Sequence, residues 1–331
     1  MYPPAPPLVA IVGPTAAGKT GLAVALGGRF GGEIISADSR QVYRHMDVGT
    51  AKPTSLEQRR VSHHLLDVAD PADSFSLGTF LTLARELIPV IGQRGHQPIL
   101  AGGTGQYVWA LLEGWQVPVV PPDPEFRARK LREAEAQGGD VLHAELRAID
   151  PQRAAELDPR NLRRVIRALE VHRFTCRPGF TGSPPSALAQ GRRRSVTALI
   201  LGLTMEREKL YQRIDDRVDQ MMAQGFLEEV KGLLDGSYSP ELPSMSGVGY
   251  QEIAAHLEGE LPLGEAVQRI KYRTHRIARH QYAWFRLKDP RIQWIEADGR
   301  EMEVGLRMAR EFLTRCDKIP SVGRPAADEV H

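Results

Sequence analysis

The stretch Gly13–Thr20 constrains the fold of this chain more than any other feature. It reads Gly-Pro-Thr-Ala-Ala-Gly-Lys-Thr and fits the pattern G-x-x-x-x-G-K-[ST], a glycine loop whose backbone N–H groups surround a phosphate. The apolar run Leu8–Val12 precedes it, as a buried parallel strand should, and a helical segment follows Thr20. Strand, loop and helix N-terminus together predict a site for a diphosphate or triphosphate.

Individual residues of the loop have different roles in binding a phosphate. Lys19 supplies a point charge, and the hydroxyl of Thr20 suits Mg²⁺, which we expect as the cofactor. Thr20 is the only predicted metal ligand. The predicted phosphate-binding residues are Gly13, Pro14, Thr15, Ala16, Ala17, Gly18, Lys19 and Thr20.

Composition limits the class of protein. A chain of 331 residues suits two domains, or one domain with a large insertion. The net charge of +2 means that a surface for nucleic acid must come from local clusters of basic residues. Cys176 and Cys316 are far apart, which disfavours a zinc site or a disulfide framework. Without a signal segment or a long apolar run, we expect a cytoplasmic protein that does not enter the membrane.

Short apolar runs alternate with helical spacing, which predicts an α/β fold with a parallel, doubly wound sheet. Four prolines within 117–124 interrupt this alternation, and the residues that follow have helical spacing only. We predict a core domain of residues 1–120 and 180–318, a helical insertion of residues 121–179 and a disordered tail of residues 319–331. Expected strands are 8–12, 33–38, 63–68, 97–101, 195–203 and 292–295, and expected helical segments in the core are 21–26, 75–91, 106–112 and 206–234 with a break at Gly225.

Three predicted strands end in chemically useful residues. These ends are Gly13–Thr20, Asp38–Gln41 and Gly102–Gly105, and they can meet in one crevice at the carboxyl edge of the sheet. Asp38 is there either a general base, a holder of metal-bound water or a turn cap. Thr104 is either a turn residue or a contact to a nucleobase.

The usual partner of such a loop in nucleotide hydrolases is missing. Those enzymes hold Mg²⁺ with an Asp after an apolar strand, whereas the strand 97–101 runs into Gly-Gly-Thr-Gly. The chain also lacks the guanine-reading pattern N-K-x-D. A loop without hydrolytic machinery suits a diphosphate that departs as a leaving group.

Basic residues gather in three places: Arg160–Arg164, Arg192–Arg194 and the run 266–287. The third contains no acidic residue, and aromatic side chains interleave with its charges. Such a run is either a solvated helix face or a nucleic-acid surface. Three clusters together make RNA a reasonable partner.

The ordered set of motifs resembles the bacterial tRNA dimethylallyltransferases, also called tRNA isopentenyltransferases. The segments that carry the resemblance are 13–20, Ser36–Arg44, Gly49–Pro53, Gly102–Tyr107, Asn161–Val165, Gly225–Val230, Gly247–Glu252 and Trp284–Arg286. The resemblance implies a P-loop NTPase-like parallel sheet with flanking helices and a helical insertion domain that grips tRNA. It also implies transfer of a dimethylallyl group from dimethylallyl pyrophosphate to the exocyclic amine (N6) of the adenosine 3′ of the anticodon, with release of pyrophosphate.

The resemblance assigns roles to individual residues. Asp38 is expected to be the general base, and Thr15 and Arg213 to bind the donor's pyrophosphate with the loop. The expected partners are dimethylallyl pyrophosphate and the tRNA anticodon stem-loop, bound by a monomer. The residues expected to meet tRNA are Asp38, Ser39, Arg40, Gln41, Thr104, Arg127, Asn161, Leu162, Arg163, Arg164, Arg273, Arg276 and Arg279.

Two positions depart from the family pattern. Ala17 stands where the loop usually has Ser, although the backbone can still surround a phosphate, and His280 stands where the basic run often has Arg. Two other functions remain open from the residues: a small-molecule kinase in which Asp38 activates a hydroxyl, and an RNA-binding NTPase. The kinase would need ATP and no RNA, and the NTPase would need the hydrolase motifs that are absent.

Overall fold

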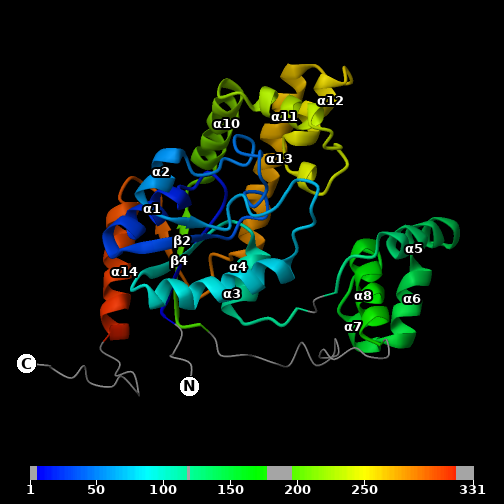
Figure 1. Ribbon diagram of the computed structural model, residues 1–331, viewed down its shortest axis with the longest axis horizontal. Helices are drawn as coiled ribbons and strands as arrows, with labels where there is room; N and C mark the ends of the chain where they lie inside the picture. The colour runs from blue at the N-terminus through cyan, green and yellow to red at the C-terminus, as the bar shows by residue number, and fades with distance from the viewer. Residues whose placement is uncertain (1–5, 118–119, 177–195, 318–331) are drawn as a thin grey trace, which may run out of the picture. The chain divides into compact units, whose positions relative to one another are not determined.

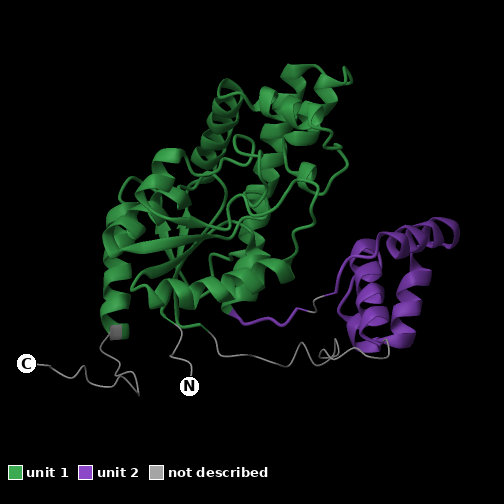
Figure 2. Cartoon of the chain, viewed as in Figure 1, with its two compact units in different colours: residues 1–112, 196–331 green, residues 113–195 purple. Residues whose placement is uncertain are grey.

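The computed structural model describes residues 6–117, 120–176 and 196–317. It consists of two compact units, one formed by residues 1–112 with 196–331 and the other by residues 113–195 (Figure 2). The predicted insertion, residues 121–179, lies within the second unit. The predicted tail, residues 319–331, lies outside the described residues.

The first unit is built on a parallel sheet of six strands, which confirms the predicted fold class. Its strand order is β3-β2-β4-β1-β5-β6, and every pair of neighbours is parallel. The strands are β1 Leu8–Val12, β2 Gly32–Ser36, β3 His63–His64, β4 Gln97–Ala101, β5 Ala198–Thr204 and β6 Ile292–Glu296.

The strand β1 lies in the middle of the sheet, which explains its composition. All five of its residues are buried, with β4 on one side and β5 on the other. The register aligns Val9 with both Ile99 and Leu199. A strand with covered faces and no free edge needs apolar residues throughout, and Leu-Val-Ala-Ile-Val supplies them.

Helices cover the sheet and extend from it (Figure 1). The structure confirms the predicted helical segments and the break at Gly225, whose φ of 96° separates α10 from α11. Helices α2, α12 and α14 are additional to the prediction, and α13 shows that most of the basic run 266–287 is helical. The helices of this unit are α1 Lys19–Phe30, α2 Ser55–Arg60, α3 Leu77–Gln93, α4 Gly105–Leu112, α10 Arg207–Ala223, α11 Phe226–Asp235, α12 Tyr250–Leu257, α13 Leu263–Trp284 and α14 Glu301–Asp317.

One predicted strand is much shorter than expected. The segment 63–68 contributes only the two residues of β3. Leu65 and Asp67 have φ angles of 62° and 56°, which a strand cannot accommodate. The chain therefore leaves the sheet after His64.

The second unit is helical over its described residues, as the spacing predicts. Its elements are α5 Pro124–Gln137, α6 Asp140–Ile149, α7 Pro151–Ala155 and α8 Leu162–Thr175. Phe126, Leu142, Leu146 and Val165 form part of a separate hydrophobic core. This unit thus buries apolar surface of its own. In neither unit does a described helix have the length and apolar character needed to cross a membrane.

Candidate active site

Three turns meet at the carboxyl edge of the sheet, as the sequence predicts. The N–H of Ala37 donates to the carbonyl of Ala101 at 2.8 Å, and the N–H of Thr104 donates back to the carbonyl of Ala37 at 3.2 Å. A Cβ at Gly102 would lie 2.2 Å from that same Ala37 oxygen, so only glycine permits this approach. The turn that follows β4 is therefore fixed against the turn that carries Asp38.

The phosphate loop joins β1 to α1 through residues with left-handed or otherwise positive φ angles. Gly13, Ala16 and Gly18 have φ angles of 139°, 64° and 94°. Gly13 also lies so close to β5 that a Cβ would be 2.4 Å from the carbonyl oxygen of Leu203. Positive φ angles in a glycine loop allow N–H groups to turn toward one side, the arrangement that binds anions.

Ala17, where the family pattern has Ser, is fully buried in the core beneath the loop. Its methyl group packs there with β1 and α1 residues. Ala17 therefore lacks the hydroxyl group that Ser would have, and only its backbone can contribute to the phosphate loop.

Charged side chains beside the loop are arranged around one carboxylate. Burial, followed by the positive charge of Arg217, lowers the pKa of Lys19 to about 8, and the charge of Asp38 partly offsets both. Burial likewise lowers the pKa of Arg217, which Asp38 again counteracts. Two cations thus interact electrostatically with one carboxylate, so these three groups carry a net positive charge that an anionic ligand would neutralise.

The arginine in this position is Arg217, which lies one helical turn after the predicted Arg213 on α10. Arg213 is exposed, and within the described residues its side chain has no recorded hydrogen bond or ion pair. Residues four apart share a helix face, which explains why the sequence pattern does not distinguish them. The pyrophosphate role of Arg213 stays a prediction, whereas the electrostatic contact belongs to Arg217.

Asp38 is oriented by its own turn. The N–H of Arg40 donates to Oδ1 of Asp38 at 2.8 Å, and the N–H of Gln41 donates to the same oxygen at 3.4 Å. The hydrogen bonds described for this carboxylate thus all use Oδ1. Its other oxygen, Oδ2, is the one available to a substrate.

Gln281 of α13 joins two of the turns. The N–H of Thr15 donates to Oε1 of Gln281 at 2.7 Å, and Nε2 of Gln281 donates to the carbonyl of Gly103 at 3.1 Å. A Cβ at Gly103 would lie 2.2 Å from this Nε2. Gln281 therefore occupies a backbone donor of the phosphate loop, and the sequence analysis does not single it out.

Several residues expected to meet tRNA make contacts within the protein. Thr104 Oγ1 accepts the N–H of Ser39 at 3.0 Å. Arg40 donates to the carbonyl of Pro243 at 2.6 Å, and Gln41 donates to the carbonyl of Ala51 at 3.1 Å. These side chains hold the Asp38 turn in place, and their tRNA contacts remain predictions.

The helix α13 presents its basic residues in two environments. Arg273 is paired with Glu252, and Lys271 with Asp219. Arg276, Arg279 and His280 are exposed, and no ion pair is recorded for them among the described residues. The exposed part of the helix is therefore free to meet phosphates.

The predicted tRNA-binding residues of the second unit also fall into two groups, those with contacts inside the protein and those that are exposed. Arg127 forms a two-pronged pair with the buried Glu170, at 2.9 and 2.8 Å. Asn161 caps α8 by accepting the N–H of Arg164, and Leu162 packs against the core. The side chains of Arg163 and Arg164 are exposed on the first turn of α8. Structural contacts are thus made by Arg127, Asn161 and Leu162, whereas Arg163 and Arg164 form an exposed basic surface. The tRNA contacts of all five residues remain predictions.

The sequence matches two family profiles. The profile described as "IPP transferase" covers residues 41–288, and that described as "Isopentenyl transferase" covers residues 6–69. The chain belongs to the IPP transferase family. All of the turns and charges described above lie within the matched residues.

Relatives of this IPP transferase share most of its length. The tRNA dimethylallyltransferase of Thermomicrobium roseum is 49% identical over 88% of this chain and 86% of its own. That of Roseiflexus castenholzii is 50% identical over 89% of this chain and 94% of its own.

Solved structures of tRNA-modifying transferases are also similar to this chain. A tRNA isopentenylpyrophosphate transferase from Bacillus halodurans superposes with a TM-score of 0.67 at 40% identity, covering 94% of this chain and 98% of that one. A eukaryotic dimethylallyltransferase acting on tRNA gives 0.79 at 27% identity, covering 98% of this chain and 82% of that one.

Proposed function

We propose that this IPP transferase transfers a dimethylallyl group from dimethylallyl pyrophosphate to N6 of the adenosine 3′ of the anticodon in tRNA. The observation that carries the proposal is that the phosphate loop and the Asp38 turn meet at one edge of the sheet, where Lys19 and Arg217 interact electrostatically with Asp38. A diphosphate needs the cations, and an amine that loses a proton needs the carboxylate. The two kinds of group occur here side by side.

In the reaction, the bond between the allylic carbon and the bridging oxygen breaks, and its electron pair leaves with pyrophosphate. The loop N–H groups, Lys19 and Arg217 stabilise the negative charge that develops on the leaving group. The N6 lone pair forms the new bond to carbon, and Oδ2 of Asp38 accepts the N6 proton. Gln281 releases the N–H of Thr15 so that this donor can bind phosphate.

The residues beside the loop also fit Mg²⁺. Among the described residues, no group of three or more His, Cys, Asp or Glu could hold a metal ion by itself. Mg²⁺ commonly keeps several waters and binds through one or two protein groups plus phosphate oxygens, and Thr20 in the first turn of α1 suits that role. When bound, the ion would neutralise charge on the departing pyrophosphate.

The exposed basic surfaces on α13 and α8 would receive the tRNA. Each unit thus contributes one basic surface, and a single chain carries the loop, the base and both surfaces. We therefore propose that the enzyme acts as a cytoplasmic monomer.

A transfer assay tests the proposal against the kinase alternative. Purified protein, tRNA, Mg²⁺ and labelled dimethylallyl pyrophosphate should give labelled tRNA without ATP. Inorganic pyrophosphate should compete with the donor. Modification that requires ATP, or ATP consumed in step with product, would favour the kinase.

Donor affinity should depend on pH through Lys19. With a pKa of about 8 in the free protein, Lys19 loses its charge as the pH rises through that value. The dissociation constant of the donor should then increase by up to about tenfold per pH unit above 8. Calorimetry from pH 7 to 9.5 measures this. Lys19→Arg, which stays charged, should flatten the profile, and an unchanged slope in that variant would exclude Lys19 as the titrating group.

Binding of an anticodon stem-loop should weaken steeply with salt. Each phosphate neutralised by a basic side chain releases counterions, so log Kd should change linearly with the logarithm of salt concentration. Replacing both Arg276 and Arg279 with Ala should reduce the slope by about two. Arg307→Ala on α14, whose arginine is paired with Glu311, is the matched control. A flat plot for the unmodified protein would contradict a phosphate-binding surface.

A further inference from the structure

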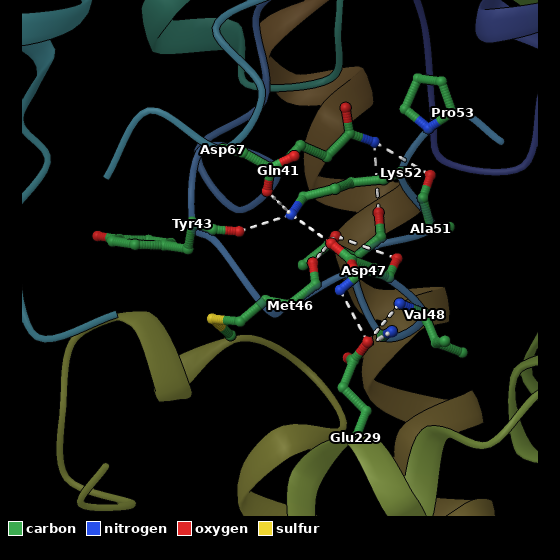
Figure 3. A network of polar contacts seen from close by, with 12 residues as sticks. Gln41, Tyr43, Met46, Asp47, Val48, Ala51, Lys52, Pro53, Asp67 and Glu229 are labelled. Atoms are coloured by element: carbon green, nitrogen blue, oxygen red, sulfur yellow. Dashed lines mark hydrogen bonds and ion pairs between the residues drawn. The ribbon is translucent and has the colours of Figure 1, made fainter. Parts of the chain in front are cut away.

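The carboxylate of Glu229, on α11, binds the backbone N–H groups of the turn formed by residues 47–52 (Figure 3). It accepts the N–H groups of Asp47 at 2.7 Å, Val48 at 2.6 Å and Gly49 at 3.1 Å. The hydroxyl of Tyr250 donates to Oε1 at 2.7 Å, and burial together with the charge of Glu229 keeps the pKa of Tyr250 well above its usual value. Four donors to one carboxylate make a strong, directional attachment.

The turn of residues 47–52 approaches α11 and α12 so closely at Gly49 that no side chain fits there. A Cβ at Gly49 would lie 2.2 Å from the ring of Phe226 and 2.7 Å from the Tyr250 hydroxyl. Phe226 and Tyr250 are themselves buried and pack edge to face, with ring centroids 5.2 Å apart. The turn therefore rests on a rigid base formed by α11 and α12.

The other side of the turn is tied to the segment that carries the base. Lys52, nearly buried, donates to the carbonyl of Tyr43 at 2.6 Å and pairs with Asp47 and Asp67 (Figure 3). The side chain of Gln41 donates to the carbonyls of Thr50 at 3.3 Å and Ala51 at 3.1 Å.

The link from Gln41 to Asp38 is direct. Gln41 also accepts a hydrogen bond from Ser36 at 3.0 Å through its side chain, and its backbone N–H donates to Oδ1 of Asp38. The chain of contacts thus runs from Glu229, through the turn, to Gln41 and then to the Asp38 carboxylate. Along this path, Gln41 is the residue that is also expected to meet tRNA.

We propose that Glu229 is a positioning residue for the transfer reaction, which aims Oδ2 of Asp38 by fixing the turn that holds Gln41. The inference rests on the proposed role of Asp38 as the base. It assigns a role in the reaction to the Gly225–Val230 segment, which otherwise contributes only packing.

Glu229→Ala should lower the single-turnover transfer rate by roughly tenfold to a hundredfold, the effect of a base displaced by about an ångström. The dissociation constants of tRNA and of the donor should change by less than about threefold, since the turn binds neither. Glu229→Gln should lose less, because its amide oxygen still accepts N–H groups. Glu228→Ala, the exposed neighbour on the same helix, is the matched control and should behave as the unmodified protein.

A double-mutant cycle with Asp38→Asn separates positioning from general damage. If Glu229 acts through Asp38, Glu229→Gln should slow the unmodified enzyme and have almost no further effect in the Asp38→Asn background. Equal losses in both backgrounds would overturn the inference, as would an unchanged rate in Glu229→Gln and Glu229→Ala alike. If Asp38→Asn is itself fully active, the proposed role of Asp38 fails instead, and the inference fails with it. Thermal melts recorded by circular dichroism show whether each variant is folded at the assay temperature. If Glu229→Ala is not folded, Glu229→Gln alone carries the test.

Discussion

Asp38→Asn should lower the single-turnover rate of transfer by roughly a hundredfold to ten-thousandfold, the range that a general base contributes. The substitution preserves shape, because the Asn oxygen can still accept the N–H groups of Arg40 and Gln41 that now bind Oδ1. What it removes is the capacity of the second oxygen to take a proton. Rapid-quench assays with saturating tRNA and donor measure the rate.

Asp298→Asn provides the matched control, since that carboxylate lies in an exposed turn and pairs with Arg300. Its rate should equal that of the unmodified enzyme. Affinity for the anticodon stem-loop should be little changed in both variants. If Asp38→Asn retains a rate within about threefold, Asp38 is not the base.

Removing either cation beside the loop should have the other large effect. Lys19→Ala and Arg217→Ala should each reduce kcat/KM for the donor by roughly a hundredfold to a thousandfold, because the charge that develops on the leaving group loses a partner in a buried site. The steady-state rate at varied donor concentration measures this.

Arg213→Ala is the matched control on the same helix. Arg213 is exposed, whereas Arg217 acts electrostatically on Lys19 and Asp38, so the loss should be confined to Arg217→Ala. A larger loss in Arg213→Ala would return the pyrophosphate role to the residue that the sequence predicts.

The sequence was sufficient to predict most of the sheet and the meeting of three turns. Both depend on local patterns: short apolar runs, glycine at positions of close approach, and the rule that parallel strands end at one edge. The break at Gly225 is another local signal, since only glycine adopts its conformation without cost. The predicted strand 63–68 is too long, because the spacing of apolar residues carries no signal for the positive φ angles of Leu65 and Asp67.

The parts that could not be predicted depend on contacts between distant segments. Arg213 and Arg217 lie on one helix face, and only the packing of α10 against the rest of the unit decides which reaches Asp38. Gln281 lies within a basic run whose charges suggest a different function. Glu229 and Gly49 are 180 positions apart in the sequence, and no local pattern connects an acidic residue on one helix with a glycine so far away.

The connectivity of the sheet also fixes when the donor site can exist during synthesis. The central strand β1 leaves the ribosome well before its neighbour β5, which follows only after the whole helical unit of residues 113–195. Gly13 is supported by Leu203, and Thr15 is bonded to Gln281, so the phosphate loop reaches its described form only after Gln281 has been synthesised. The helical unit is built from contacts close in sequence and can form earlier. A nascent chain therefore carries an open edge on its central strand until β5 has been synthesised, and an unpaired strand edge is prone to misassembly.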